Sequence, residues 1–273
     1  MNNDLPDGVE HKQPVTFQAL NVMLNKTFKL SSLRVSRQNI PEYEIIIVGG
    51  PYPKNGRNAH RLHAYGDVVH IPFSDEESWE KSKEFKDIKI NKHPGLKNGW
   101  ITKKKNLIWK NSKYNNIVML HDYYYFLPGW YENFKKFGDD WDFCWNVKLN
   151  YWNGRHRDWV SWDHPSYPMR SNLPYTDTNS TKYQYFDGNY TIGKKEAWEK
   201  YPWNEKYLYG MPEDLEWSFR VRKDNNLTLK FNANSIVKHI IPRYTGDERF
   251  SWQDERKTTK ALEYLKKTYP EEW

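Results

Sequence analysis

The chain has 273 residues, enough for one α/β domain with a substantial core or for two small domains. Aromatic residues make up 17% of it, and so many rings exclude a disordered chain. The formal net charge of +7 favours an anionic ligand, such as a nucleotide diphosphate, a nucleic acid or an acidic membrane surface, without choosing among them. Cys144 is the only cysteine, which excludes both a disulfide framework and a cysteine-rich zinc site.

Targeting signals are absent from the sequence pattern. The first ten residues are polar and acidic where a secretory signal would be apolar, and no apolar run is long enough to cross a bilayer. For a chain with a single cysteine, a reducing compartment is the simpler assumption. We therefore expect a soluble, cytoplasmic protein, with the membrane surface as an alternative location.

The first half of the chain alternates between strand and helix patterns. The clearest strand is Tyr43 to Val48, an apolar β-branched run that ends at Gly49 and Gly50, as a buried parallel strand does where it opens into a loop. Such loops lie at the edge of the sheet where α/β proteins bind ligands. The other predicted elements are a strand within Pro14–Val22, a helix Phe28–Gln38, a strand Asp67–Phe73, a helix Thr102–Lys110 and a strand Asn116–Leu120.

The second half begins where the strand Asn116–Leu120 ends at His121 and Asp122. A Pro-Gly-Trp turn and a helix to Phe137 follow. From Asp139 to Thr181 the periodicity is lost and Trp, Tyr, His, Asn and Pro accumulate, which predicts one or two strands and then a long ordered excursion. The remaining predicted elements are a strand Phe186–Ile192, a helix from Lys194, a helix Pro212–Lys223, a strand Thr228–Phe231 and a charged helix Trp252–Lys267.

This alternation predicts a single α/β domain with a mixed, mostly parallel sheet flanked by helices. No stretch of linker composition separates two halves. We divide the chain into a polar extension at 1–13, a domain at 14–245 that includes the aromatic excursion at about 141–181, and a charged helical tail at 246–273.

Candidate metal ligands stand at the ends of two predicted strands. A carboxylate at the position of Asp122 can hold a divalent metal, which would neutralise a diphosphate leaving group; the alternative is a residue that caps a turn. His239 follows a short apolar run. Neutral imidazole binds divalent metals, although a lone histidine is more often structural.

Candidate groups for acid–base chemistry and for phosphate binding open two predicted helices. Glu213 and Asp214 follow Pro212, where they complement the helix dipole or supply a general base for an acceptor hydroxyl. Lys103 to Asn106 can bring ammonium charges and N–H groups to phosphate oxygens, although a charge run is usually a solvated face. No Walker loop, dinucleotide fingerprint or hydrolase nucleophile elbow is present.

Five segments, taken in order, resemble the family-2 glycosyltransferases and their relatives on the GT-A fold. The resemblance extends from about Val15 to His239. The segments are EIIIVGG at 44–50 (second strand), GWITKKKN at 99–106 (before the metal motif), IVMLHDYYYFLPGWYENF at 117–134 (metal motif), FDGNYTIGKKEAW at 186–198 (acceptor side) and GMPEDLEWSFRVRK at 210–223 (Glu-Asp pair).

The resemblance implies a transferase that moves a sugar from a nucleotide diphosphate sugar to an acceptor hydroxyl in one inverting displacement. Asp214 would be the catalytic base, with Glu213 supporting it. The donor would be bound by Gly49, Gly50, Lys104, Lys105, Asn106 and Asp122, the acceptor side would include Gly188, Asn189 and Trp130, and a divalent metal, Mn²⁺ or Mg²⁺, would be held by Asp122 and His239.

Two segments depart from the family pattern. The metal motif is His121-Asp122-Tyr123, with one carboxylate where the family has two, so a full metal site needs His239 and the diphosphate. The segment Phe17 to Asn25 matches the first-strand loop of the family only loosely. We expect the aromatic stretch from Trp141 to Tyr175 to shape the acceptor site, closing as a lid over bound donor.

The expected partners are a nucleotide diphosphate sugar and a glycan, lipid-linked or protein acceptor, with peripheral membrane contact and no nucleic acid. Two alternatives stay open. One is a non-catalytic carbohydrate-binding or nucleotide-sugar-binding protein on the same fold. The other is a basic module that binds single-stranded nucleic acid through its charge and rings. The sugar, the nucleotide, the acceptor and the oligomeric state are not specified by the sequence.

Overall fold

The computed structural model describes residues 15–20, 40, 42–48, 67–71, 100–121, 124–166, 170–177, 181–207 and 212–239. The helices expected at Phe28–Gln38 and Trp252–Lys267 lie outside these residues, and so do the candidate site residues Gly49, Gly50 and Asp122. None of the helices in the described ranges is long and apolar enough to cross a bilayer.

The first half of the main sheet is parallel, as the sequence predicts. Strand β2 lies between β1 and β3, and β1 also pairs with β4. Within β2, Ile45 packs into one core cluster while Ile46 and Val48 pack into a second cluster, on the opposite face. Burial on both faces explains the continuous apolar run. The strands are β1 (Val15–Leu20), β2 (Tyr43–Val48), β3 (Asp67–Ile71) and β4 (Asn116–Leu120).

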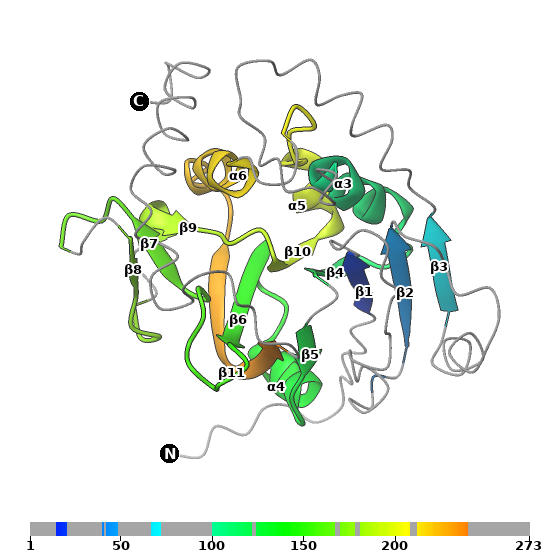
Figure 1. Ribbon diagram of the computed structural model, residues 1–273, viewed down its shortest axis with the longest axis horizontal. Coiled ribbons are helices and arrows are strands. Elements are labelled where there is room, and N and C mark those ends of the chain that lie inside the picture. Colours follow the sequence, from blue (N-terminus) through cyan, green and yellow to red (C-terminus); the bar gives the residue numbers. More distant parts are fainter. Residues whose placement is uncertain are drawn as a thin grey trace, which may run out of the picture.

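The second half of this sheet is mixed. Strand β10 pairs antiparallel with β4 and β6, β6 pairs parallel with β11, and β11 pairs antiparallel with β5. The order β3-β2-β1-β4-β10-β6-β11-β5 confirms the predicted α/β fold with a mixed, mostly parallel sheet (Figure 1). The strands are β5 (Tyr124–Phe126), β6 (Phe143–Leu149), β10 (Tyr190–Lys194) and β11 (Leu229–His239).

Helices pack against the sheet through the two separate core clusters. One cluster includes the stacked rings of Trp198, Trp203 and Trp217, and the other includes Trp130 and Phe134 from α4. Figure 1 shows α3, α5 and α6 grouped together, away from α4. The helices are α3 (Ile101–Asn111), α4 (Trp130–Phe137), α5 (Lys195–Lys200), α6 (Glu213–Arg222) and a short 3-10 helix (Thr181–Tyr183).

The aromatic segment after Asp139 contributes to the core. It begins with β6, and its later strands, β7 and β8, form a small antiparallel sheet with β9, in the order β8-β7-β9. The rings of Trp145, Trp159 and Trp162 are buried, whereas Trp152 is 54% exposed. Most of these rings are therefore packing groups, and closure of the segment as a lid stays a prediction. The strands are β7 (Val160–Trp162), β8 (Arg170–Asn172) and β9 (Gln184–Tyr185).

Two strands differ from their predicted bounds. The strand expected at Phe186–Ile192 begins at Tyr190, and the residues before it form an irregular turn, because Asp, Gly and Asn favour turns. The strand expected to end at Phe231 continues to His239 through a register irregularity. Both differences move candidate site residues, since the first places Gly188 in a turn and the second places His239 in the main sheet.

The backbone of Gly193 in β10 lies against the aromatic core. A Cβ at this position would lie 2.6 Å from atoms of both Phe143 and Trp198. We expect Gly193→Ala to lower the free energy of unfolding by about 1–3 kcal/mol, because rings in a close-packed core have little room to retreat. Urea unfolding followed by tryptophan fluorescence measures the difference.

The matched control for this prediction is Thr191→Val, two residues earlier in the same strand. The Thr191 hydroxyl is buried and makes no hydrogen bond within the described part of the chain, so replacing it by a methyl group should be neutral or stabilising. A Gly193→Ala protein as stable as the wild type would contradict the close packing at this strand.

Candidate active site

The turn before β10 brings three elements of the chain together at Gly188. A Cβ on this glycine would lie 2.7 Å from Lys105 Nζ and 3.1 Å from Asp214 Cβ. Lys105 comes from α3 and Asp214 from the first turn of α6, so the turn contacts both helices. Glycine permits this approach, because a side chain here would have to displace the lysine or the carboxylate.

Lys105 is completely buried, although it belongs to a run of three lysines. Its Nζ lies 3.6 Å from the centre of the Trp203 ring and 3.8 Å from Glu213 Oε1. Burial lowers the pKa of Lys105, while the charges of Glu213 and Asp214 oppose that shift. The run is therefore not simply a solvated face, since one of its members faces the candidate catalytic carboxyl groups.

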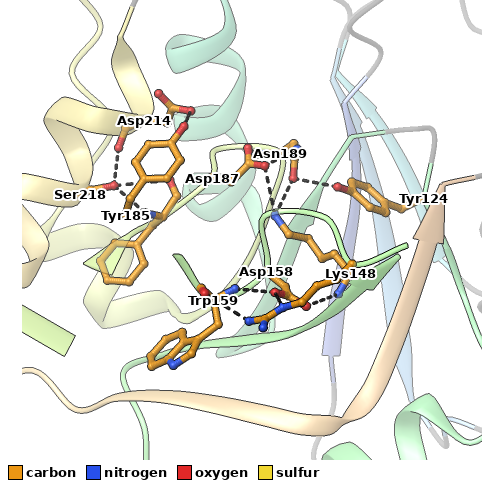
Figure 2. A network of polar contacts seen from close by, with 11 residues as sticks. Tyr124, Lys148, Asp158, Trp159, Tyr185, Asp187, Asn189, Asp214 and Ser218 are labelled. Atoms are coloured by element: carbon orange, nitrogen blue, oxygen red, sulfur yellow. Dashed lines mark hydrogen bonds and ion pairs between the residues drawn. The ribbon is translucent and has the colours of Figure 1, made fainter. Parts of the chain in front are cut away.

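Hydrogen bonds tie the first turn of α6 to the segment that precedes β10. The Tyr185 hydroxyl, on β9, donates to Asp214 Oδ2 at 2.5 Å (Figure 2). Ser218 Oγ donates to the backbone carbonyl of Asp214 at 2.5 Å and accepts the N–H of Phe186 at 2.8 Å. The Asp214 carboxyl group is thus held by Tyr185 on β9 and by the N–H of Leu215 on its own helix, while Ser218 holds the backbone of the turn.

Burial raises the pKa of both candidate carboxyl groups. The pKa of Glu213 rises to about 8 through burial and, next, through the neighbouring charge of Asp214. The pKa of Asp214 is also raised, by burial first and by Asp187 second, while the hydrogen bond from Tyr185 lowers it. Carboxyl groups with raised pKa values are suited to take up a proton near neutral pH.

A second polar network is built on the two chain neighbours of Gly188. Asp187 Oδ2 accepts a charged hydrogen bond from Lys148 Nζ at 3.3 Å and one from Asn189 Nδ2 at 2.7 Å. Asn189 Oδ1 accepts from Lys148 Nζ at 3.1 Å and from the Tyr124 hydroxyl at 2.9 Å. Figure 2 shows Lys148 extending from β6 towards both side chains. The side chain of Asn189 is therefore held at both amide atoms.

The candidate metal ligand His239 lies beside this network at the end of β11. Its ring centre is 4.5 Å from that of Tyr124 and 4.6 Å from that of His156. Within the described ranges, no three His, Cys, Asp or Glu side chains come together to hold a metal ion. The described side chains alone therefore do not form a cation site. The other candidate ligand, Asp122, lies outside the described residues.

Two residues that we expected at the ligand have packing roles. Asn106 Nδ2 donates to the carbonyl of Trp203 at 2.8 Å, and its Oδ1 accepts the N–H of the same residue at 2.9 Å. The amide thus holds the ring on which Lys105 lies. Trp130 is 1% exposed and stacks on Phe134 with ring centres 5.2 Å apart, so it packs in the core, and its place on the acceptor side stays a prediction. Lys104 is buried as well.

The structure adds three residues to the site that the sequence analysis did not single out. Lys148 is the one charged residue in the strand FCWNVKL, and that isolation was the available signal, since a buried lysine needs a partner. Asp187 precedes Gly188 in a triplet that lies within a predicted strand, although its composition favours a turn. Tyr185 carries no signal that separates it from the other tyrosines.

The raised pKa of Glu213 predicts a pH dependence of stability. The unfolded carboxyl group releases its proton near pH 4.5 and the folded one near pH 8, so the wild type loses stability as the pH rises through this window. Glutamine has no proton to release. We expect Glu213→Gln to gain about 4 kcal/mol relative to the wild type between pH 5 and pH 8.5, measured by urea unfolding.

The control for this measurement is Glu199→Gln, which alters an exposed carboxyl group on α5. Its stability relative to the wild type should stay constant across the same pH range. A Glu213→Gln protein that behaves like the control would show that the Glu213 carboxyl group is not desolvated in solution.

Comparisons with known proteins agree at the level of fold. No family model and no curated protein matches this chain. The structure is similar to GalNAc-T7 with UDP, GalNAc and Mn²⁺, with a TM-score of 0.56, 13% identity, and coverage of 86% of this chain and 45% of that one. It is also similar to Staphylococcus aureus TarS 1-349 in complex with UDP, with a TM-score of 0.52, 10% identity, and coverage of 95% and 72%.

A further TarS 1-349 structure gives a TM-score of 0.52 at 11% identity and covers 84% of this chain and 60% of that chain. The chain thus spans about half to three quarters of the length of these proteins. At such low identity the likeness establishes architecture alone. The strand order and these neighbours together show that the chain has the GT-A-like fold of glycosyltransferases.

Proposed function

We propose that the chain is a glycosyltransferase that moves a sugar from a nucleotide diphosphate sugar to an acceptor hydroxyl. One observation carries this proposal. On a GT-A-like fold, the Glu213–Asp214 pair lies against the Gly188 turn with a buried lysine beside it. A base and a cation next to one turn match the two needs of the reaction, which are removal of a proton from the acceptor and binding of an anionic donor.

Asp214 is the proposed general base. Its two carboxyl oxygens accept one hydrogen bond each, from Tyr185 and from the N–H of Leu215, which leaves lone pairs for an acceptor hydroxyl. Glu213, with a pKa of about 8, carries its proton at neutral pH and can donate a hydrogen bond to the acceptor or to Asp214. The expected inversion of the sugar follows from the family resemblance and is part of the proposal.

The donor side of the proposal rests on charge. Lys105 Nζ, beside Gly188, would face phosphate oxygens, and two of the structural neighbours contain UDP. A divalent cation, Mn²⁺ or Mg²⁺, would neutralise the departing diphosphate, and Asp122 with His239 would hold it. The acceptor is proposed to be a glycan, a lipid-linked sugar or a protein hydroxyl, and the site of action to be the cytoplasm or a membrane surface.

Substitution of the proposed base separates catalysis from binding. Asp214→Asn keeps the shape of the side chain and removes its basicity, so we expect transfer to fall by about 10²–10⁴-fold while donor binding is retained. Product formation with radiolabelled donor and calorimetric binding of the same donor measure the two effects. Asp224→Asn, which breaks the ion pair with Lys200 beyond the end of α6, is the control and should keep near-normal turnover. Near-normal turnover by Asp214→Asn would refute the assignment.

A panel of nucleotide diphosphate sugars, each with and without Mn²⁺, tests the donor class. A donor at 100 times its Kd should stabilise the folded protein by about 2.7 kcal/mol, seen as a rise in Tm. A rise that is selective for one donor and needs Mn²⁺ would identify both donor and cofactor. If no donor raises the Tm of a well-folded sample, the transferase proposal is wrong and oligosaccharides and oligonucleotides become the next panel.

A further inference from the structure

Asp187 belongs to the second polar network, beside Gly188, and has no role in the chemistry described above. Its carboxylate pairs with Lys148 Nζ at 3.3 Å, and the exposed fractions of the two side chains are only 6% and 0%. Burial alone would raise the pKa of Asp187, but the charges of Lys148 and Arg157 hold it well below its usual range. The carboxylate is therefore ionised throughout the neutral range.

The pair helps to hold the turn in place, together with the His121 N–H, which donates to the Asn189 carbonyl at 2.9 Å. Asp187 accepts both the backbone N–H of Asn189, at 3.3 Å, and its side-chain amide, at 2.7 Å. Lys148 binds the other amide atom of Asn189 at 3.1 Å. Gly188 lies between these two residues, so a movement of the turn away from Lys105 and Asp214 would break the hydrogen bonds to Lys148.

The charge of Asp187 also acts on Asp214, where it raises the pKa more than any other group does. Within the described part of the chain, charged and polar groups from several elements act on the same carboxyl group. Tyr185, Lys105 and Arg157 lower its pKa, and Asp187 opposes them. Tyr185 lies on β9, Lys105 on α3 and Arg157 in the connection between β6 and β7, and Asp187 lies in the turn before β10. Glu213 is the neighbour of Asp214 on α6.

We propose that Asp187, anchored by Lys148, is a positioning residue for sugar transfer: it holds the Gly188–Asn189 backbone against the site and fixes a negative charge opposite Asp214. The inference rests on the proposed function, because its kinetic consequence requires Asp214 to act as the base. A fixed negative charge keeps a neighbouring carboxylate basic, and a more basic carboxylate takes a hydroxyl proton more readily. Asp187 acts through Asp214 and the turn.

The first test uses the protein without substrate. Carbon-13 NMR of the aspartate carboxyl groups gives the pKa of Asp214, with Asp214→Asn identifying its resonance. We expect Asp187→Asn to lower this pKa by about one unit, and Lys148→Met to leave it unchanged or raise it, since the charge of Asp187 remains. Both variants break the pair, so both should speed hydrogen exchange at the Gly188 and Asn189 amides by about tenfold or more.

Two further variants show whether a change in either readout comes from a general loss of structure. Asp224→Asn breaks an ion pair elsewhere and should change neither readout. Lys148→Arg keeps the cation and should restore the amide protection that Lys148→Met loses, which tests the positioning role even if Asp187→Asn does not fold. An unchanged pKa of Asp214 in Asp187→Asn overturns the electrostatic part of the proposal. Unchanged amide exchange in Asp187→Asn and Lys148→Met overturns the positioning part.

The second test is kinetic. The acidic limb of the kcat profile should move about one pH unit lower in Asp187→Asn, with a lower plateau and an unchanged donor KM, and Asp187→Glu should restore the limb. If the wild type transfers sugar and Asp187→Asn keeps the wild-type limb, this inference fails and the proposed function stands. If the wild type transfers no sugar, the proposed function fails, and the NMR titration still decides whether Asp187 acts on Asp214.

Discussion

The approach of the Gly188 backbone to Lys105 and Asp214 is the constraint on which the site depends. A Cβ there would come within 2.7 Å of the lysine nitrogen. Each contacting element is held for its own reason: α6 by the Ser218 hydrogen bonds and α3 by the anchoring of Trp203 through Asn106. The site is thus assembled by packing among a turn and two helices, and its chemistry follows from how tightly they meet.

Charge is balanced inside this packed region. Two buried lysines, Lys105 and Lys148, face three carboxyl groups, and each lysine loses part of its basicity through burial. The pKa values of the three carboxyl groups differ accordingly. Asp187, paired with Lys148, stays ionised, whereas Glu213 and Asp214 have raised pKa values. This division lets neighbouring acids serve different purposes, one as a fixed charge and the others as groups that exchange protons.

Many of the described aromatic residues belong to the packed core. A stack of three rings, Trp198, Trp203 and Trp217, joins α5 and α6. The Trp203 ring also makes a cation–π contact with the Lys105 ammonium group. Asn106 and Trp130, which resemblance placed at the ligand, are absorbed into this framework. Rings and amides next to the candidate functional groups thus also belong to the packed framework, because the framework and the site share the same elements.

Local sequence patterns alone specified much of the fold: the buried run of β2, the helix that begins after Pro212 and the order of strands and helices all follow from neighbouring residues. The same patterns marked Lys105, Glu213 and Asp214 as candidates, and the family resemblance added Gly188. They could not join Asp187 to Lys148, because 39 residues separate the two and only the adjacency of β6 and β10 in the sheet brings them together. Tertiary structure decided which charges are buried, and burial in turn sets the pKa values on which the proposed chemistry relies.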